Sequence, residues 1–351
     1  MKPKYKKYKI KKGDTLASVS NILGKPTQEV KNFHNIFCDH ENFIILDFPE
    51  NFEELFIYPE YSEVDLNPIP KVFFDGGNKL LFRPISKKMN YGVQYTIKTG
   101  DKISTMKFDT SVYFKRKNQD GMCLFEIDRI SKTFLNDEET ANIAEELAEK
   151  VASVIYPLEI IVDNEGKWTD IYNYDQIQKR WENIKTSILE NYEGEFVKKY
   201  LQISENTLEN ESALLFALSK DWFLNAFFGG IYINYSSKYS CNRAISFPIL
   251  PFCEAPNYAV EQKIDEYLDN YKLISIEQAG NLNDDRAKLD FENNLDFPYY
   301  AMQEPPEEKA FGKFKARYFL NSTSHCIESM RLKSSIDLEI PKSLEIVISL
   351  L

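Results

Sequence analysis

Side chains able to bind a metal ion gather in one short stretch of the sequence. Cys38 and His40 are separated by one residue, and His34 lies four positions before Cys38. Thiolates and imidazoles are the usual ligands of zinc, so these three residues have the right chemistry for an ion. Their spacing matches no zinc motif, however. We therefore interpret them as unrelated residues of one loop and predict no metal site and no cofactor.

The sequence also lacks a pattern typical of catalysis. His325 and Cys326 are adjacent, and neighbours in a strand or turn rarely direct their side chains toward each other. Acidic pairs such as Asp284 and Asp285 have the chemistry of a glycosidase, but a chain with 54 acidic residues contains such pairs by chance. There is no Gly-x-Ser-x-Gly elbow, phosphate-binding glycine loop or His-Glu-x-x-His helix. We predict that the protein is not an enzyme and has no catalytic residues.

Composition indicates a globular protein. The 351 residues include 43 basic and 54 acidic side chains, which give a formal net charge of -11, and 43% of the residues are apolar. A chain of this length has room for two domains with a substantial core. The acidic balance argues against nucleic acid as a partner, because phosphate binding depends on an excess of Lys and Arg.

The sequence carries no signal for export or membrane insertion. No apolar stretch follows the basic start, and no apolar run is long enough to cross a bilayer. The five cysteines are scattered and odd in number, which is typical of reduced thiols. We predict a cytoplasmic location, so that any delivery to the cell envelope would require a non-classical route.

Seven lysines stand among the first twelve residues. Two interpretations are open. The local positive charge can attract an anionic surface despite the negative total, or the lysines can simply protect an exposed edge strand from aggregation.

The first sixty residues predict four elements in the order strand, helix, helix, strand. Apolar and charged residues alternate up to the turn at Gly13 and Asp14, and Asp14 or Thr15 is suited to cap the helix that follows. Leu16, Val19 and Leu23 form the apolar stripe of that helix, and a second short helix ends near Asn35. Residues 55–57 return as a strand that ends at Pro59.

This unit resembles the LysM domain family. The resemblance rests on the following residues: Tyr8, Ile10, Gly13, Asp14, Thr15, Leu16, Val19, Asn35, Leu55, Ile57 and Pro59. It implies a βααβ module over residues 1–66. The chain departs from the family between Asn35 and Leu55, where it is longer and carries extra apolar residues at 43–48.

LysM domains bind N-acetylglucosamine-containing glycans such as peptidoglycan in a shallow groove between two loops. The resemblance implies that Gly13, Asp14, Thr15 and Leu16 are glycan-binding residues, and that the long second loop alters half of the groove. The same four residues also have a purely structural interpretation, because Asp14 and Thr15 are suited to cap a helix and Leu16 to lie in the core.

A similar opening recurs at residues 95–104, with Gly100 and Asp101 at its turn. No paired helices follow it, so we predict a hairpin there rather than a second LysM unit.

We predict that residues 67–351 form an α+β domain of antiparallel strands with a central helical cluster, and we recognise no family for it. The linker is expected at residues 67–70, and the helix after residue 136 is expected to be capped by Asn136 or Asp137. Ile177, Trp181, Ile184 and Ile188 have the spacing of the apolar face of a helix, and further helices are predicted at 195–208 and 212–228. Residues 158–172 are predicted to form a hairpin. The predicted blocks are strand-rich 71–130, helical 136–228 and strand-rich 230–350, and the individual strands are predicted at 71–74, 80–83, 91–98, 111–116, 122–130, 158–162, 167–172, 230–235, 244–250, 271–278, 287–292, 310–320, 327–334 and 338–350.

Three functions follow as hypotheses. The first is a non-enzymatic protein that binds N-acetylglucosamine-containing glycan through its LysM-like module. The second is a structural or adaptor subunit of a phage-tail-like contractile injection assembly, such as a type VI secretion baseplate, in which the module contacts protein subunits. The third, a cell-wall hydrolase, has no catalytic motif to support it.

Overall fold

The computed structural model describes residues 5–39, 42–49, 52–59, 70–74, 76–139 and 143–351. Within these ranges, none of the helices combines the length and the apolar character needed to cross a bilayer. The predicted linker at residues 67–70 falls outside the described part, apart from Pro70.

The start of the chain forms a small N-terminal module, which we define as residues 5–59. Its elements are β1 (Lys6–Lys9), α1 (Leu16–Leu23), α2 (Thr27–Phe37) and β2 (Glu54–Ile57). β1 and β2 pair antiparallel, which closes the module on itself. Its own small core is formed by Leu16, Val19, Val30, Ile44 and Leu55.

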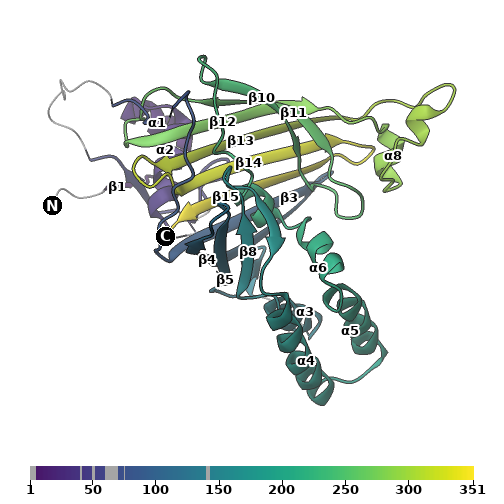
Figure 1. The fold of residues 1–351 in the computed structure, drawn as a ribbon. Helices are drawn as coiled ribbons and strands as arrows, with labels where there is room; N and C mark the ends of the chain where they lie inside the picture. The colour runs from purple at the N-terminus through teal and green to yellow at the C-terminus, as the bar shows by residue number, and fades with distance from the viewer. Residues whose placement is uncertain (1–4, 40–41, 50–51, 60–69, 75, 140–142) are drawn as a thin grey trace.

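The remaining strands join one large antiparallel sheet (Figure 1). They are β3 (Met89–Thr99), β4 (Lys102–Lys117), β5 (Cys123–Arg129), β6 (Phe134–Leu135), β7 (Glu138–Glu139), β8 (Leu158–Val162), β9 (Trp168–Ile171), β10 (Ser240–Ser246), β11 (Asn257–Ile264), β12 (Leu273–Leu282), β13 (Phe311–Asn321), β14 (Ile327–Asp337) and β15 (Lys342–Leu350). Their order is β10-β11-β12-β13-β14-β15-β3-β4-β5-β8-β9, with β6 and β7 beside β4.

The two strand-rich blocks of the sequence therefore belong to one sheet. The last strand, β15, pairs along its length with β3, the first strand of the sheet in the chain. This ladder unites the strands from β3 to β9 and the strands from β10 to β15 in one sheet. The α+β class predicted from the sequence is confirmed, and the helical cluster lies between the two blocks in sequence but beside a continuous sheet in space.

The helices of the larger part are α3 (Ile143–Ser153), α4 (Tyr174–Asn191), α5 (Glu195–Leu208), α6 (Glu211–Leu218), α7 (Trp222–Phe227) and α8 (Lys288–Glu292), with a short 3-10 turn η2 (Tyr300–Met302). Apolar residues of α3 to α7 share one core with one face of the sheet. In α4, the residues Ile177, Trp181 and Ile188 are buried, as the helical spacing of these residues predicts.

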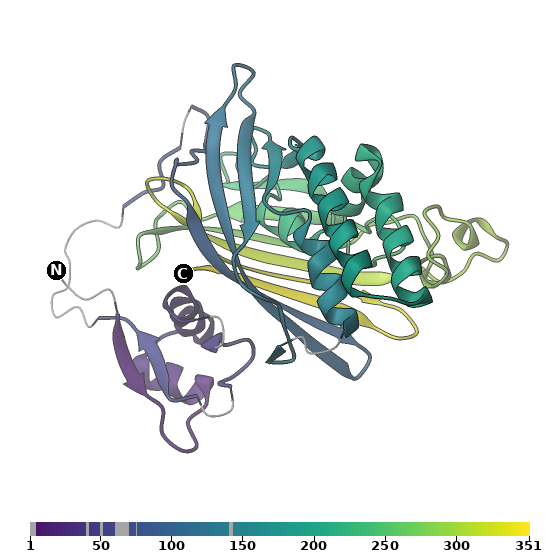
Figure 2. The same ribbon diagram turned by 90° about the horizontal axis from the view of Figure 1, so that it is seen from below.

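The opposite face of the sheet carries the N-terminal module. Because successive side chains of a strand point to opposite faces, Ile346 and Ile348 of β15 enter the main core while Val347 faces the other way. Val347 packs there with Cys38 and Phe43 of the module. Figure 2 shows the module on one side of the sheet and the helices on the other.

Several predicted elements are confirmed. Residues around Gly100 and Asp101 form the turn of the β3–β4 hairpin, which supports a hairpin rather than a second module at this position. The hairpin of β8 and β9 is present, and α5 covers the residues expected to be helical.

Other predicted elements are wrong. Asn136 and Asp137 do not cap a helix but lie at positive φ between β6 and β7, and α3 begins later. Residues 287–292 form α8 instead of a strand, and residues 71–74, 80–83 and 230–235 contain no regular strand, although Lys71, Lys79 and Asn234 take part in isolated bridges. The strand β11 is absent from the predicted strands, although its burial alternates strictly.

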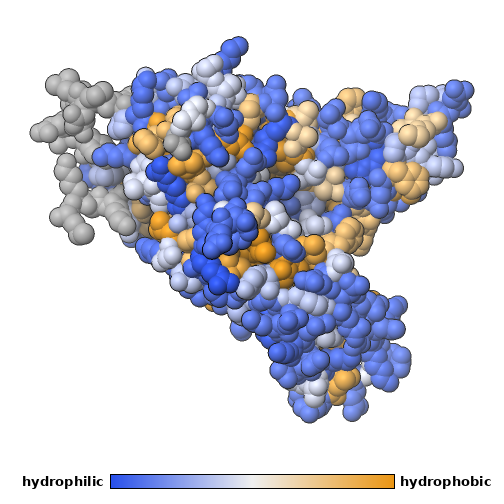
Figure 3. All heavy atoms as spheres, in the orientation of Figure 1, coloured by the Kyte–Doolittle hydropathy of each residue, from blue (hydrophilic) through white to orange (hydrophobic). Residues whose placement is uncertain are grey.

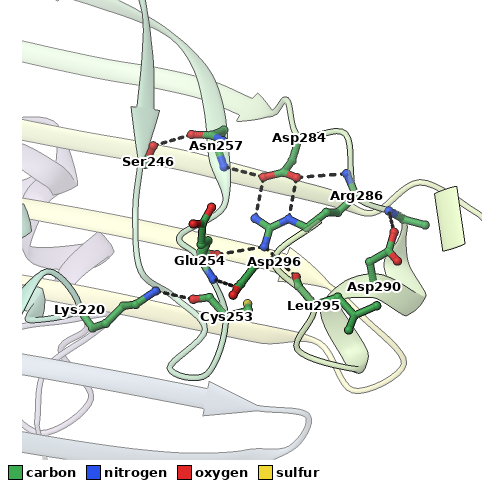
Figure 4. A network of polar contacts seen from close by, with 11 residues as sticks. Lys220, Ser246, Cys253, Glu254, Asn257, Asp284, Arg286, Asp290, Leu295 and Asp296 are labelled. Atoms are coloured by element: carbon green, nitrogen blue, oxygen red, sulfur yellow. Dashed lines mark hydrogen bonds and ion pairs between the residues drawn. The ribbon is translucent and has the colours of Figure 1, made fainter. Parts of the chain in front are cut away.

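A long connection between β12 and β13 projects from one end of the sheet and contains α8 and η2. We call residues 283–310 the arm. Arg286 is buried in it and pairs with both carboxylate oxygens of Asp284, with each N–O distance 2.8 Å. The same guanidinium donates to the carbonyls of Glu254 and Leu295 (Figure 4). It also lies 4.2 Å from the ring centre of Phe291.

This buried pair gives a prediction about the arm. Arg286→Met should lower the free energy of unfolding by about 3 kcal/mol, because it leaves a buried carboxylate and two carbonyls without their donor. Urea unfolding followed by tryptophan fluorescence measures the change. Lys313→Met, at an exposed position of β13, is the control and should leave the urea midpoint nearly unchanged; an equal loss in both variants would contradict the assignment.

Candidate functional site

The loop between β1 and α1 holds the four residues that the LysM resemblance selects. Gly13 has a φ of +94°, in the region that favours glycine. The Asp14 carboxylate accepts hydrogen bonds from the Lys11 backbone N–H at 2.9 Å and from the Tyr8 hydroxyl at 3.2 Å. Asp14 therefore stabilises the turn itself.

Thr15 and Leu16 build the start of α1. The Thr15 hydroxyl accepts from the Ser18 N–H at 3.1 Å, and the Ser18 hydroxyl accepts from the Thr15 N–H at 2.9 Å, a reciprocal capping box. The Leu16 side chain is only 2% exposed and lies in the core of the module. Both residues thus have the structural roles that the sequence offered as one of two interpretations.

The long second loop approaches the first one. The Asp47 carboxylate accepts a hydrogen bond from the Leu16 backbone N–H at 2.6 Å and another from the Phe48 N–H at 2.8 Å. Ile44 from the same loop is fully buried beside Leu16. The Leu16 N–H, which belongs to the loop that the LysM resemblance selects, is therefore already paired with a carboxylate of the chain itself. Nothing in the sequence pattern had singled out Asp47.

Two polar residues of α2 hold the second loop in place. Asn35 donates from its amide to the Ile44 carbonyl and accepts from the Ile44 N–H, both at 3.0 Å. His34 accepts from the Phe56 N–H at its Nδ1 atom, 2.9 Å away, and its Nε2 atom lies 3.0 Å from the Asn42 carbonyl. Since a carbonyl only accepts, Nε2 carries the proton and the ring is neutral.

These contacts account for the residues first considered as metal ligands. Both nitrogens of His34 are engaged, and burial lowers its pKa to about 4. Cys38 is buried as well, and burial raises the pKa of its thiol, while His40 falls outside the described residues. In the part of the chain that the structure describes, no three His, Cys, Asp or Glu side chains are grouped to hold a metal ion.

Helix α2 also fastens the module to the sheet. Glu29 accepts from the Tyr271 hydroxyl at 3.1 Å, and Arg331 of β14 donates to Gln28 at 3.2 Å. The Ser349 hydroxyl of β15 donates to the Asn35 carbonyl. The module is therefore bound to the face of the sheet by polar contacts around the apolar cluster at Val347.

Charged side chains are buried at this contact. Lys31 of α2 is 5% exposed and donates to the Ile45 carbonyl at 2.6 Å. Burial, together with the nearby Arg331, lowers its pKa to about 8, while Glu345 opposes this shift. Arg331 and Glu345 pair across β14 and β15 at 2.7 Å. The contact thus holds two cations beside one carboxylate.

A cavity of about 260 Å³ lies along the seam between module and sheet. Its walls include Phe33 and Glu29 of α2 and Asp269, Tyr271 and Arg317 of the larger part. Burial raises the pKa of Asp269 to about 6. The rings of Tyr271 and Phe33 lie 4.9 Å apart, so aromatic packing closes the seam beside the cavity.

The remaining candidates for chemistry are separate. His325 uses its Nδ1 atom in a 2.8 Å contact with the Leu81 carbonyl and makes no contact of this kind with Cys326. Asp284 is paired with Arg286 rather than with Asp285. Neither pair forms an arrangement for acid–base or nucleophilic catalysis.

Comparisons with known proteins do not assign the chain to a family. No family model and no curated protein matches the sequence. Among solved structures, the chain is similar to lipovitellin, in a structure of lipid–protein interactions in that protein, with a TM-score of 0.42 and 9% sequence identity. The alignment covers 77% of this chain but only 25% of the lipovitellin chain. A likeness this distant carries no argument about function, and the LysM resemblance stays a prediction.

The buried lysine predicts a pH dependence of the module. Because the pKa of Lys31 is about 8 in the folded protein and 10.5 when it is exposed, the unfolded state holds the extra proton between these values. Stability of the module should rise as the pH increases from 8 to 10.5, by about 3 kcal/mol at most. Lys31→Met should abolish this rise and stabilise the module at neutral pH.

Alkylation of the buried Cys38, resolved by peptide mass spectrometry and normalised to denatured protein at each pH, reports opening of the module. Lys12→Met, at an exposed position of the same module, is the matched control and should keep the pH dependence of the native protein. A native protein with no such dependence would contradict the burial of a cationic Lys31.

The buried His34 predicts that the module loses stability at acidic pH. Its pKa is about 4 when folded and 6.5 when exposed, so the unfolded state binds more protons between these values. Stability should therefore be lost as the pH falls from 6.5 to 4, by about 3 kcal/mol. His34→Gln should weaken this acid sensitivity in the same Cys38 assay. An unchanged acid limb would show that another group controls it.

Proposed function

We propose that this protein is a non-enzymatic structural or adaptor subunit of a larger protein assembly, in which the N-terminal module makes protein contacts. The observation that supports this proposal is the hydrogen bond from the Leu16 N–H to Asp47. This bond occupies one backbone donor of the loop that the LysM resemblance assigns to a glycan, and the Leu16 side chain is buried. A contractile injection machine of the phage-tail type is the class of assembly that the LysM resemblance suggests.

The docking of the module supports the same proposal. Two domains joined by a linker usually move relative to each other unless a substantial interface holds them together. Here α2 is fixed to the sheet through Glu29, Gln28 and Asn35, and Val347 of β15 packs against the module. Module and sheet therefore present one continuous surface, as a subunit placed between others requires.

Glycan binding is the second candidate, and one observation favours it. Lys11, Lys12, Gly13 and Thr15 are exposed, so the outer rim of the predicted groove remains accessible to a sugar. In this proposal the module would bind N-acetylglucosamine-containing glycan with the rim of the loop and the hydroxyl of Thr15, whereas Leu16 would only support the fold.

An experiment separates the two candidates. The full-length protein should not be retained on insoluble peptidoglycan or chitin, and in extracts of its native cells it should sediment with large particles. Deletion of residues 1–59 should release it from the particles, whereas Lys198→Gln on α5 should not. Retention on peptidoglycan that N-acetylglucosamine oligomers compete away would favour the glycan candidate instead.

A single substitution tests whether Asp47 prevents sugar binding. Asp47→Ala frees the Leu16 N–H while Thr15 still caps α1, so the fold should survive. If the second loop is what blocks the sugar, this variant should gain retention on peptidoglycan relative to the native protein. Absence of retention in both proteins would leave the protein-contact proposal in place.

A further inference from the structure

Large apolar side chains are exposed at the end of the arm. The exposed fractions are 57% for Phe297, 52% for Tyr299 and 78% for Met302, and Phe252, from the β10–β11 connection, is 80% exposed. We call these four residues the arm patch. The ring centres of Phe297 and Tyr299 lie 6.3 Å apart, and exposed apolar side chains that lie together are typical of an interaction site. In Figure 3, hydrophobic spheres gather among hydrophilic ones on the arm.

The arm patch is held on a rigid support. The Asp290 carboxylate accepts from the N–H groups of Ala287 and Tyr300 at 2.7 Å each. Asp296 accepts from the Glu254 N–H at 2.6 Å, which fastens the β10–β11 connection to the arm (Figure 4). Together with the buried Arg286 pair, these bonds fix the backbone in advance, so that binding costs little conformational entropy.

The arm that carries the arm patch also holds exposed carboxylates, which we call its acidic rim. They are Asp285, Asp296, Glu304, Glu307 and Glu308. An apolar patch with an acidic rim is complementary to a surface that combines lysines with apolar groups. The aliphatic part of a lysine can cover an aromatic ring while its ammonium reaches the rim.

The N-terminal module carries such a surface. Lys6, Lys7 and Lys9 of β1 and the following Lys11 and Lys12 are exposed; we call these five residues the basic strand. The Nζ atom of Lys7 already lies 5.6 Å from the ring centre of Phe56, beside its ion pair with Glu54. The arm and β1 lie at opposite ends of the molecule (Figure 1), so the two surfaces of one chain do not meet.

We propose that the arm patch binds the basic strand of a second copy of this chain. The contact is head-to-tail, because it joins two different surfaces located at opposite ends. Each added copy leaves one free arm patch and one free basic strand, so the association continues into a chain or a ring. The inference deepens the proposed structural role by naming one partner, and it concerns the purified protein alone.

Sedimentation velocity of the purified full-length protein tests the proposal. The average mass should increase with protein concentration, with a dissociation constant on the order of 10 μM, as for a small and mostly polar interface. Raising the salt concentration from about 0.05 M to about 0.5 M should weaken the association about tenfold, because exposed charges carry it.

Two variants remove one side of the contact each. The strand variant combines Lys9→Gln, Lys11→Gln and Lys12→Gln, and it keeps Lys7 and its ion pair. The arm variant combines Phe297→Ser, Tyr299→Ser and Met302→Ser, whose side chains are exposed. Each variant alone should be monomeric. An equal mixture should form dimers and stop there, because only one arm patch and one basic strand remain intact in each pair.

Matched controls exclude a general effect of charge. Lys179→Gln, Lys198→Gln and Lys199→Gln remove three exposed lysines from α4 and α5 and should leave self-association unchanged. A native protein that stays monomeric at low salt, a mixture that stays monomeric, or controls as weak as the strand variant would overturn the proposal. Binding to anionic phosphatidylserine vesicles without self-association would assign the lysines to a membrane surface and overturn it as well. Particle association of a monomeric protein would still support the proposed function.

Discussion

The pairing of β15 with β3 is the constraint on which the rest of the structure depends. It joins the end of the chain to the strand that opens the sheet, across most of the sequence. Such a ladder requires the closure of a very long loop, which costs conformational entropy. Burial of both strands offsets this cost. Both strands meet this condition, since residues 344–348 of β15 and 91–95 of β3 are buried. Without this ladder, the helices and the module would lack a common support.

Burial on both faces follows from what each face carries. Helices α3 to α7 cover one face, where Tyr91, Ile346 and Ile348 lie in the main core. The module covers part of the other, where Val347 and the Arg331–Glu345 pair meet α2. Because Lys31 is buried against that pair, the fit of the module depends on the charge of one side chain. The protonation of Lys31 therefore affects how strongly the module is held on the sheet.

The same arrangement shapes the functional proposals. In the module, α2 is fixed to the sheet and Asp47 pairs with the Leu16 N–H, whereas the lysines of β1 remain exposed. The buried Asp284–Arg286 pair gives the opposite end of the sheet a rigid arm whose aromatic residues remain exposed. Two different surfaces at opposite ends suit a subunit that is added repeatedly, and this agrees with a structural role better than with the capture of a soluble ligand.

The sequence by itself determined the local elements. The spacing of Ile177, Trp181 and Ile188 predicted α4, and the Gly100–Asp101 turn predicted the β3–β4 hairpin, because helical and strand periods are properties of neighbouring residues. It also predicted the α+β class. Sequence patterns did not reveal β11, and they gave α8 as a strand, since tertiary contacts override short local preferences.

Only the tertiary structure decided which distant segments meet. The union of the two strand blocks, the docking of the module and the partners of Asp47 and Lys31 all connect residues that are far apart in the chain or in irregular loops. Gly13, Asp14, Thr15 and Leu16 could be selected because the sequence resembles the LysM family, whereas Asp47, which pairs with the Leu16 N–H, could not. The spacing of apolar residues indicates which face of a strand or helix is buried, but it does not indicate which other segment covers that face.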